Sequence, residues 1–545
     1  MKKRFLFLMC VIFFAIFVMS ACEAKPGPVG ATGADGPEGK SAYQAYKEKY
    51  NYEGTEQEWL QDLINGELST LPEHLVTFDP NNGELAFTQS IKDGEKAKRP
   101  SLPIRDGYTF QGWMYDDGIA EEIWNFGGGS ITEDITLIAK WDYATYELPI
   151  ININTDDAEI DSKENYTDMT FSLENCESEF FDLSGGIRLR GNSTSKYGKK
   201  PYRIKFDSKQ PLFGLKKAKS WVLLAEYLDP SALHNYTAFS LASQMPGLGF
   251  TPTPYKVNVY LNGVYAGLYT LCEQVQENEG RMDIELDEIT EDMVDLKDFN
   301  FFIAMDWSVT EDPTAILDET YFYLEEYDQY FELKYPEKSQ FVSQQQFDSF
   351  WAQLKAYVKE MMQAFENPDV EANKEKIQNE VNLNSLVDYL IIDQIMGEQD
   401  HAWKSFNMYY TNTSSDQENG KLNFGPIWDY DWCLYTPWTG SPNEDYTVSD
   451  EIAYSNIFFT AVADVPEFYE MVKERYTLYA SPALEAYLEQ FDEIASSVTE
   501  SVAINAAKWY TSFDPDLSQD NIDFLKEYLE NRKAVLDDAW LVATD

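Results

Sequence analysis

The spacing of apolar residues predicts that the chain after about residue 146 starts with strands and ends with helices. Residues 148–153 form an apolar, β-branched run of the kind that opens a sheet. Over 187–190 and again over 202–206, apolar and cationic residues alternate. This predicts strands with the apolar side chains on one face and the cations on the other. We therefore expect one sizeable α+β domain over residues 146–545.

A hairpin is predicted where two apolar runs, 257–261 and 264–271, flank Asn262 and Gly263. This pair is favoured in a type I′ turn, because both central residues need a positive φ. The second strand of the hairpin ends at Glu273. Glu273 either holds one of the upstream lysines in an ion pair, as in phosphoryl-transfer sites, or lies in solvent as a strand-end carboxylate.

A helix is predicted to begin after Asn384, its N-cap, and to end at Gly397, with leucine or isoleucine at 386, 390, 391 and 395. A polar loop that contains Asp400 follows the helix. Asn407 then opens an aromatic stretch, a turn-rich spacer covers 411–420, and a second stretch covers 422–427. The two stretches predict another hairpin, directly followed by Trp-Asp-Tyr-Asp-Trp over 428–432.

Between residues 76 and 141 the pattern predicts short strands and tight turns, one of them at Asn82-Gly83. A domain of this length buries little surface, so its aromatic residues are expected to form the core. These residues are Tyr108, Phe110, Trp113, Trp124, Phe126 and Trp141.

The first residues have the pattern of an export signal. Three cations at 2–4 precede an apolar run over 5–18, which is too short for an ordinary transmembrane helix. The small residues before Cys22 resemble the end of a bacterial lipoprotein signal, which implies cleavage after Ala21 and diacylation of the Cys22 thiol. The alternative is an ordinary secretory signal cut after Ala21, with Cys22 as a bystander.

Two short segments follow the predicted anchor. Glycine recurs every third residue from Gly27 to Gly39, which is the collagen pattern. Five triplets are too few for a stable triple helix, so a flexible stalk is the favoured interpretation. Residues 41–68 predict a short helical segment, whose start signal is Gly54-Thr55 with Glu58.

Composition narrows the class of partner. The chain has 42 Lys and Arg against 94 Asp and Glu, a net charge of −52. Such a charge argues against nucleic acid, because a phosphate backbone requires a basic face. Three histidines argue against a His-rich metal site. After Cys22 only Cys176, Cys272 and Cys433 remain, which is no disulfide framework.

The cations are concentrated in residues 188–219, the basic segment, which holds eleven of them and a single acidic residue, Asp207. Its loop over 191–195 adds hydroxyls and backbone N–H groups that can donate to phosphate oxygens. The cations either pair with carboxylates elsewhere in the chain or form an anion clamp. We favour a clamp for nucleotide phosphates.

Four polar residues near the second hairpin are candidates for metal-assisted phosphoryl transfer: Asp400, Asn407, Asp429 and Asp431. Mg²⁺ prefers hard oxygen ligands such as these. If 428–432 is extended, Asp429 and Asp431 point to opposite faces, so only one binds the metal directly, and we expect Asp429. The alternative is a pair of turn aspartates between core tryptophans, but the basic segment upstream favours a site.

Several blocks of the sequence together resemble the spore coat protein H (CotH) kinase family. They lie over 188–194, 200–206, 221–225, 263–273 and 425–431, and the Arg-Gly-Asn-Ser-Thr and Trp-Asp-x-Asp motifs are the most specific. The resemblance covers most of 146–545 and implies an atypical protein-kinase-like fold. It also implies that ATP and a divalent metal, Mg²⁺ or Mn²⁺, serve to phosphorylate Ser, Thr or Tyr of exported or coat proteins. Residues 76–141 resemble the internalin-type B-repeat (Listeria–Bacteroides repeat), a small β-grasp-like unit of surface proteins.

The CotH resemblance assigns roles by position. Asp400 corresponds to the catalytic-loop aspartate and Asp429 to the metal-binding one, with Asn407 and Asp431 as further metal ligands. The predicted nucleotide contacts are Arg190, Ser193, Lys200, Lys205 and Glu273.

Two features depart from protein kinases. Asp400 and Asn407 are seven residues apart, longer than the usual loop, and no Gly-x-Gly-x-x-Gly loop precedes the strands. In our interpretation the hydroxyl-rich segment 192–195 takes the place of that loop.

The sequence therefore predicts an exported, lipid-anchored atypical protein kinase at the outer face of a bacterial membrane, with an exported or surface protein as substrate. The alternative is a non-catalytic display or adhesion lipoprotein with a kinase-like scaffold, which the stalk, the repeat and the scarcity of ATP outside the membrane favour. The predicted parts are a signal peptide (1–21), a lipid-anchored stalk (22–41), a helical segment (42–70), a β-grasp-like repeat (75–142) and a kinase-like domain (146–545).

Overall fold

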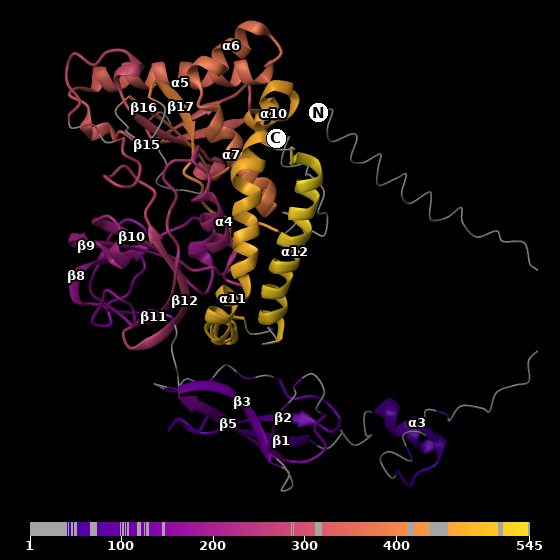
Figure 1. Cartoon of the computed structure of the whole chain (residues 1–545). Coiled ribbons are helices and arrows are strands. Elements are labelled where there is room, and N and C mark those ends of the chain that lie inside the picture. Colours follow the sequence, from indigo (N-terminus) through magenta and orange to yellow (C-terminus); the bar gives the residue numbers. More distant parts are fainter. Residues whose placement is uncertain are drawn as a thin grey trace, which may run out of the picture. The chain divides into compact units, whose positions relative to one another are not determined.

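The computed structural model describes most residues from 41 to 542 (Figure 1). Outside it lie 1–40, 42, 45–46, 48–51, 66–72, 99, 101–102, 104, 106–107, 117–120, 125, 127–129, 144–147, 285, 287, 311–318, 413–418, 435–455, 511–515 and 543–545. The predicted leader, Cys22 and nearly all of the stalk fall outside the described residues, so the lipid anchor stays a prediction. Within the described residues no helix is both long and apolar enough to cross a membrane.

The predicted helix start at Thr55 is confirmed. Helix α3 covers Glu56–Asn65. The backbone N–H of Thr55 donates to Glu58 Oε2 at 2.7 Å and the N–H of Glu58 donates to Thr55 Oγ1 at 3.4 Å. This reciprocal capping satisfies two donors that the first helical turn otherwise leaves without a partner.

A separate mixed sheet follows, with strand order β2-β1-β5-β3-β4, in which β1 and β5 run parallel. Its strands are β1 (Glu73–Asp79), β2 (Phe87–Lys92), β3 (Tyr108–Asp116), β4 (Glu121–Ile123) and β5 (Ile135–Tyr143). Trp113 is buried, and Trp124, Phe126 and Trp141 pack against the same core, as predicted. The side chains of Tyr108 and Phe110 are outside the description.

The first half of the remaining chain forms a closed barrel in the order β10-β12-β11-β6-β7-β8-β9. Its strands are β6 (Ile150–Asn154), β7 (Thr167–Glu174), β8 (Phe180–Leu189), β9 (Tyr202–Gln210), β10 (Ala218–Leu224), β11 (Tyr255–Leu261) and β12 (Val264–Glu273). Ile187, Ile204 and Phe206 are buried in the barrel core, so the alternating cations lie on its outer side, as predicted. Asn262 and Gly263 both have positive φ, 51° and 75°, which confirms the type I′ turn between β11 and β12.

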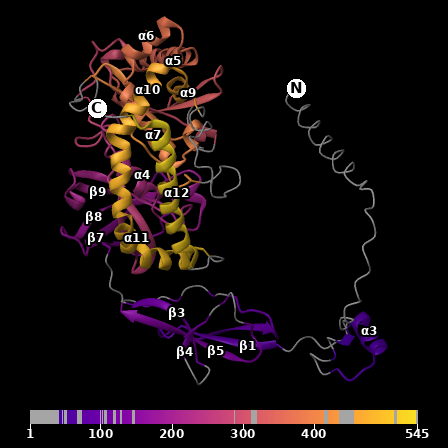
Figure 2. The same cartoon turned by 45° about the vertical axis from the view of Figure 1, so that its right-hand side comes forward.

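A second, antiparallel sheet has the order β14-β15-β13-β16-β17. Its strands are β13 (Phe301–Met305), β14 (Tyr321–Leu324), β15 (Gln329–Tyr335), β16 (Phe406–Thr411) and β17 (Lys421–Phe424). The helices of this part are α4 (His234–Ala242), α5 (Gln344–Glu366), α6 (Glu371–Glu380), α7 (Leu383–Met396), α9 (Ile457–Asp464), α10 (Pro466–Arg475), α11 (Ser481–Trp509) and α12 (Asp516–Trp540). Helix α11 packs on β12 and α4 and lies beside α12 (Figure 2). The mixed α+β class is confirmed.

Helix α7 is the central element that positions the site. Twelve of its residues, Ser385 to Met396, are buried, so it is enclosed on all sides. Its end at Gly397 is confirmed, with a left-handed φ of 64°. Its predicted N-cap, Asn384, is wrong by two residues: Asn382 caps the helix by accepting from the N–H of Ser385. The side-chain amide of Asn382 also donates to Asn423 on β17 at 2.8 Å, which holds Asn382 in the capping position. Only the folded chain supplies this partner.

Candidate active site

The loop after α7 places Asp400 at the start of a short 3-10 turn, Asp400–Ala402. The Lys404 ammonium lies 2.6 Å from Asp400 Oδ2. Burial disfavours the charged form of Lys404, but the carboxylates of Asp429 and Asp400 outweigh it and raise the pKa of Lys404 well above its usual value. The half-buried ammonium group of Lys404 therefore pairs with Asp400, and the charge of Asp429 also acts on it.

Asp429 adopts a left-handed backbone conformation, with a φ of 73°. Such a conformation costs a non-glycine residue free energy and is found preferentially at functional sites. Ser405 Oγ donates to Asp429 Oδ2 at 3.0 Å. The chain turns here and does not run extended, so the expectation that Asp429 and Asp431 point to opposite faces is wrong: both line one cavity of about 20 Å³.

The carboxylates around this small cavity repel one another. Burial, and then the charges of Asp429 and Glu226, raise the pKa of Asp431 well above its usual value. In the loop that holds Asp400, outside this cavity, burial also raises the pKa of Glu398, to about 8, and the charge of Asp400 acts in the same direction. A divalent cation relieves repulsion of this kind. In the part of the chain that the structure covers, however, no three His, Cys, Asp or Glu side chains are grouped closely enough to form a complete metal site.

His401 connects the loop after α7 to α7 itself and to the turn formed by residues 428–431, the aspartate turn. Its Nδ1 donates to both oxygens of Asp393, each at 3.0 Å, and its Nε2 donates to the carbonyl oxygen of Trp428 at 2.8 Å. Burial opposes protonation, but the neighbouring Asp393 carboxylate prevails and raises the pKa of His401 to about 9. Tyr430 Oη donates to Asp393 Oδ1 at 2.6 Å, so α7 holds both sides of the site.

A second, larger cavity of about 640 Å³ separates the barrel from the second sheet. This volume lies in the usual range for small-molecule sites, roughly 300–1,000 Å³. Arg190 and Arg203 line its barrel side, and Lys334 and Asn407 line the opposite side. Arg190 also lines the small cavity of Asp429, and its guanidinium carbon lies 5.1 Å from the centre of the Trp428 ring. Arg190 therefore stands where the two cavities meet.

Comparison with known families gives two matches. The family model described as "CotH kinase protein" matches residues 187–536, well over half of the chain. The chain belongs to the CotH kinase family. The model of the Listeria-Bacteroides repeat domain matches residues 74–140, which identifies the first sheet as such a repeat.

Two relatives from Evansella cellulosilytica match shorter stretches. One, named "Putative membrane protein", is 28% identical over 115 residues, which are 19% of this chain and 17% of the relative. The other, named "Putative Gly-rich membrane protein", is 32% identical over 76 residues, 14% of this chain and 9% of the relative. Because the chain spans so little of either relative, these matches carry no activity over to it.

The residues predicted to contact the nucleotide do not all lie near the cavities beside Asp429. Lys200 Nζ donates to the carbonyl oxygen of Ser195 at 2.8 Å, so it shapes the hydroxyl-rich loop. Ser193 is exposed in that loop. Lys205 lines a different cavity, of about 840 Å³, beside Tyr166. Of the predicted contacts, Arg190 alone lines both cavities near Asp429.

Two expectations about ion pairs have clear outcomes. Glu273 ends β12 as predicted, but it accepts from the N–H of Thr253 at 2.7 Å, and the cation whose charge acts on it is Arg281 rather than a lysine. Neither interpretation of Glu273 holds: it pairs with no lysine among the described residues, and it is buried rather than exposed to solvent. Among the described residues, no cation of the basic segment other than Lys196 forms a direct ion pair with a carboxylate. The contacts therefore do not support the alternative in which these cations pair with carboxylates elsewhere in the chain.

Asn407 is buried, and its Nδ2 donates to the carbonyl oxygen of Pro426 at 2.8 Å. It lines the larger cavity and is not among the residues around the small one.

Sequence reasoning missed several residues of the site. Lys404 had a signal, because it lies four residues after Asp400 in a polar loop. Glu226 and Asn235 had none, since they are far from the aspartates in sequence and reach the small cavity only through the fold.

Proposed function

We propose that this CotH family member is a protein kinase that transfers the γ-phosphoryl group of ATP to a hydroxyl of an exported or surface protein. The observation that carries the proposal is the ion pair of Asp400 with Lys404, whose charge also interacts with Asp429, together with Arg190 and Asp429 on the wall of one cavity. Opposed acidic and cationic groups of this kind are the parts that phosphoryl transfer requires. In this proposal the barrel is the nucleotide-binding half of a kinase-like fold.

The residues present fit a nucleotide with a bound metal. Arg190 and Arg203 supply guanidinium donors for phosphate oxygens on one wall of the 640 Å³ cavity. Asp429 and Asp431 would hold Mg²⁺ or Mn²⁺, which neutralises charge on the transferred group. Two carboxylates suffice for Mg²⁺, because it takes its other ligands from phosphate oxygens and water. Asn407 remains a proposed further ligand.

The chain's own residues divide the chemistry between them. In this proposal Asp400 accepts the proton of the substrate hydroxyl, whose oxygen forms the new bond to phosphorus as the bond to the ADP oxygen breaks. Lys404 holds Asp400 in place through their 2.6 Å contact, and its positive charge also acts on Asp429. The stacking of Arg190 on Trp428 fixes a phosphate-binding group next to the aspartate turn.

The cellular setting of the proposal rests on the predicted lipoprotein signal at Cys22 and on the Listeria-Bacteroides repeat. Both favour a protein tethered to the outer face of a membrane. The repeat also favours the second candidate function, a surface display protein whose CotH domain binds without transferring phosphate.

The test of the proposed function uses the purified full chain. Mg²⁺ and ATP together should raise its melting temperature, because a ligand that binds only the folded state stabilises it by about 2.7 kcal/mol at a hundredfold excess over its dissociation constant. γ-Labelled ATP should label the chain itself or an added surface-protein extract. Stabilisation without any label would support the display function, and the absence of both would reject the kinase proposal.

Substitution of Lys404 by methionine should lower kcat by roughly a hundredfold with little change in the binding of ATP, because Lys404 acts on the aspartates and not on the nucleotide pocket. Single-turnover labelling and ATP titration measure the two effects. Lys421→Met, a lysine at the start of β17, is the matched control and should leave both values unchanged. A large loss of ATP binding in Lys404→Met, with normal kcat at saturation, would contradict the assigned role.

A further inference from the structure

Glu226 lies on the wall of the small cavity that Asp429 and Asp431 share. It follows β10, is buried, and has a positive φ of 50°. Both oxygens of its carboxylate already have hydrogen-bond donors: Thr270 Oγ1 donates to Oε1 at 2.6 Å, and Asn235 Nδ2 donates to Oε2 at 2.9 Å. The Glu226 carboxylate is therefore held on both sides by neighbouring side chains.

Asn235, on α4, passes this orientation to the aspartate turn. While its Nδ2 donates to Glu226, its Oδ1 accepts from the backbone N–H of Tyr430 at 2.9 Å. Tyr430 stands between Asp429 and Asp431 in the sequence. An amide with a carboxylate on one side and an N–H on the other has only one favourable orientation. The Glu226 carboxylate thereby keeps the amide oxygen of Asn235 directed at the backbone N–H of Tyr430.

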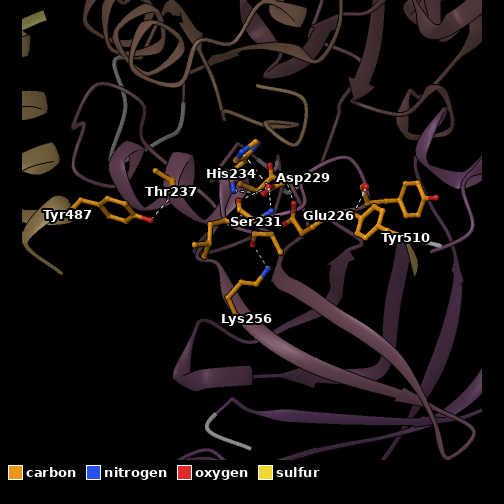
Figure 3. A network of polar contacts seen from close by, with 12 residues as sticks. Glu226, Asp229, Ser231, His234, Thr237, Lys256, Tyr487 and Tyr510 are labelled. Atoms are coloured by element: carbon orange, nitrogen blue, oxygen red, sulfur yellow. Dashed lines mark hydrogen bonds and ion pairs between the residues drawn. The ribbon is translucent and has the colours of Figure 1, made fainter. Parts of the chain in front are cut away.

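The chain of contacts begins on the outer face of the barrel at Lys256, on β11, because its neighbours Val257 and Val259 fill the barrel core. The Lys256 ammonium donates to Thr270 Oγ1 at 2.9 Å and to the carbonyl oxygen of Ala232 at 2.6 Å. Because an ammonium group can only donate, the Thr270 hydroxyl must accept from Lys256 and direct its own proton to Glu226. Figure 3 shows Lys256 reaching up from the barrel strands toward Glu226 and the start of α4.

We propose that Glu226 is a positioning residue, and that the contacts Lys256–Thr270–Glu226–Asn235 hold the Tyr430 amide and thereby set the separation of the Asp429 and Asp431 carboxylates. These four residues, the relay, connect two barrel strands and α4 to the aspartate turn. The relay couples the barrel, which carries Arg190, to the aspartates that bind the metal. The inference rests on the proposed function for its consequence, but the geometry of the turn is testable without ATP.

The decisive variant is Thr270→Val, which removes one hydroxyl at nearly constant shape and touches neither cavity. Thr270→Ser, which restores the hydroxyl, is the rescue variant. Thr237→Val is the matched control, because Thr237 is equally buried and its hydroxyl bonds to Tyr487 Oη at 2.8 Å on the far side of the network (Figure 3). Asn235→Ala breaks the last contact of the relay and serves if Thr270→Val does not fold.

Two measurements are made on the full chain. The first is hydrogen exchange of the segment 425–434 without metal or nucleotide. Thr270→Val and Asn235→Ala should speed exchange at Tyr430 by about tenfold, since a buried N–H that loses its partner opens more easily. The second is the dissociation constant of Mn²⁺ in the presence of ATP, followed by electron paramagnetic resonance. Both variants should weaken it by about tenfold, as loss of supporting contacts around metal ligands commonly does.

Thr270→Ser and Thr237→Val should match the wild type in both measurements, even if Thr237→Val lowers the melting temperature. Exchange at 425–434 that is the same in Thr270→Val and Thr237→Val would overturn the relay. A wild type that binds Mn²⁺ and ATP but transfers no phosphate would reject the proposed kinase function and leave the relay supported by faster exchange. Faster exchange with unchanged Mn²⁺ affinity would overturn the positioning role.

Discussion

Asp429→Ala is expected to abolish phosphoryl transfer while the chain stays folded. Asp429 lies in the small cavity, accepts from Ser405 Oγ and acts on Lys404, so the variant removes a proposed metal ligand together with a charge that acts on Lys404. A metal's charge stabilisation is worth several kcal/mol, and each factor of ten in rate is about 1.4 kcal/mol, so the loss should reach roughly a thousandfold or more. Labelling with γ-labelled ATP measures it.

The companion variant Asp400→Asn keeps the shape of the loop and removes the proposed proton acceptor. It should slow transfer by about 10²–10⁴-fold, the usual contribution of a general base. Asp369→Ala, at an exposed aspartate between α5 and α6, is the control and should transfer normally. Equal labelling of the wild type and Asp429→Ala would show that the observed phosphate comes from another enzyme or site, and would remove the support for this active site.

Asp388→Ala is expected to cause the largest loss of stability among the single substitutions considered. The Asp388 carboxylate is buried on α7, and Arg475 Nη2 donates to its Oδ2 at 2.6 Å. The N–H of Gly247 donates to the same oxygen at 2.8 Å. Burial raises the pKa of Asp388 against the opposing effect of Arg475, so the carboxylate depends on these partners. Its removal leaves the mostly buried Arg475 without its counter-charge, which costs about 3–5 kcal/mol.

Guanidinium titration followed by tryptophan fluorescence measures this loss in the full chain. Glu380→Ala, which breaks the more exposed pair with Lys376, is the control and should cost less than about 1 kcal/mol. The double variant Asp388→Ala, Arg475→Leu should recover part of the loss, since no buried charge then lacks a partner. Equal midpoints for Asp388→Ala and Glu380→Ala would show that the buried pair does not support α7.

Local sequence rules predicted those features that depend on neighbours in the chain. Alternation placed Ile187 and Ile204 inside the barrel, and the Asn262-Gly263 pair specified its turn, because both are decided within a few residues. The same holds for the order of helix, acidic loop, hairpin and aspartate motif, which the structure follows from α7 to Tyr430. The family resemblance, carried by short motifs, is likewise confirmed.

Rules based on neighbouring residues failed where a side chain has a partner that is distant in the sequence. The N-cap of α7 is Asn382 because Asn423 holds that side chain. The cation whose charge acts on Glu273 is Arg281, from the chain after β12, rather than a lysine. Neither partner could be recognised from residues nearby.

The sequence by itself determined which residue types are available for phosphoryl transfer and in what order they occur, because propensity and pattern act over a few residues at a time. Only the tertiary structure decided which of them meet. In the folded chain Arg190 lines the cavity of Asp429, whereas Lys205 lines a different cavity. The left-handed φ of Asp429 lets Asp429 and Asp431 line the same cavity. The tertiary structure also brought Glu226 to that cavity. These choices depend on hydrogen bonds and charges between segments hundreds of residues apart, which no local pattern records.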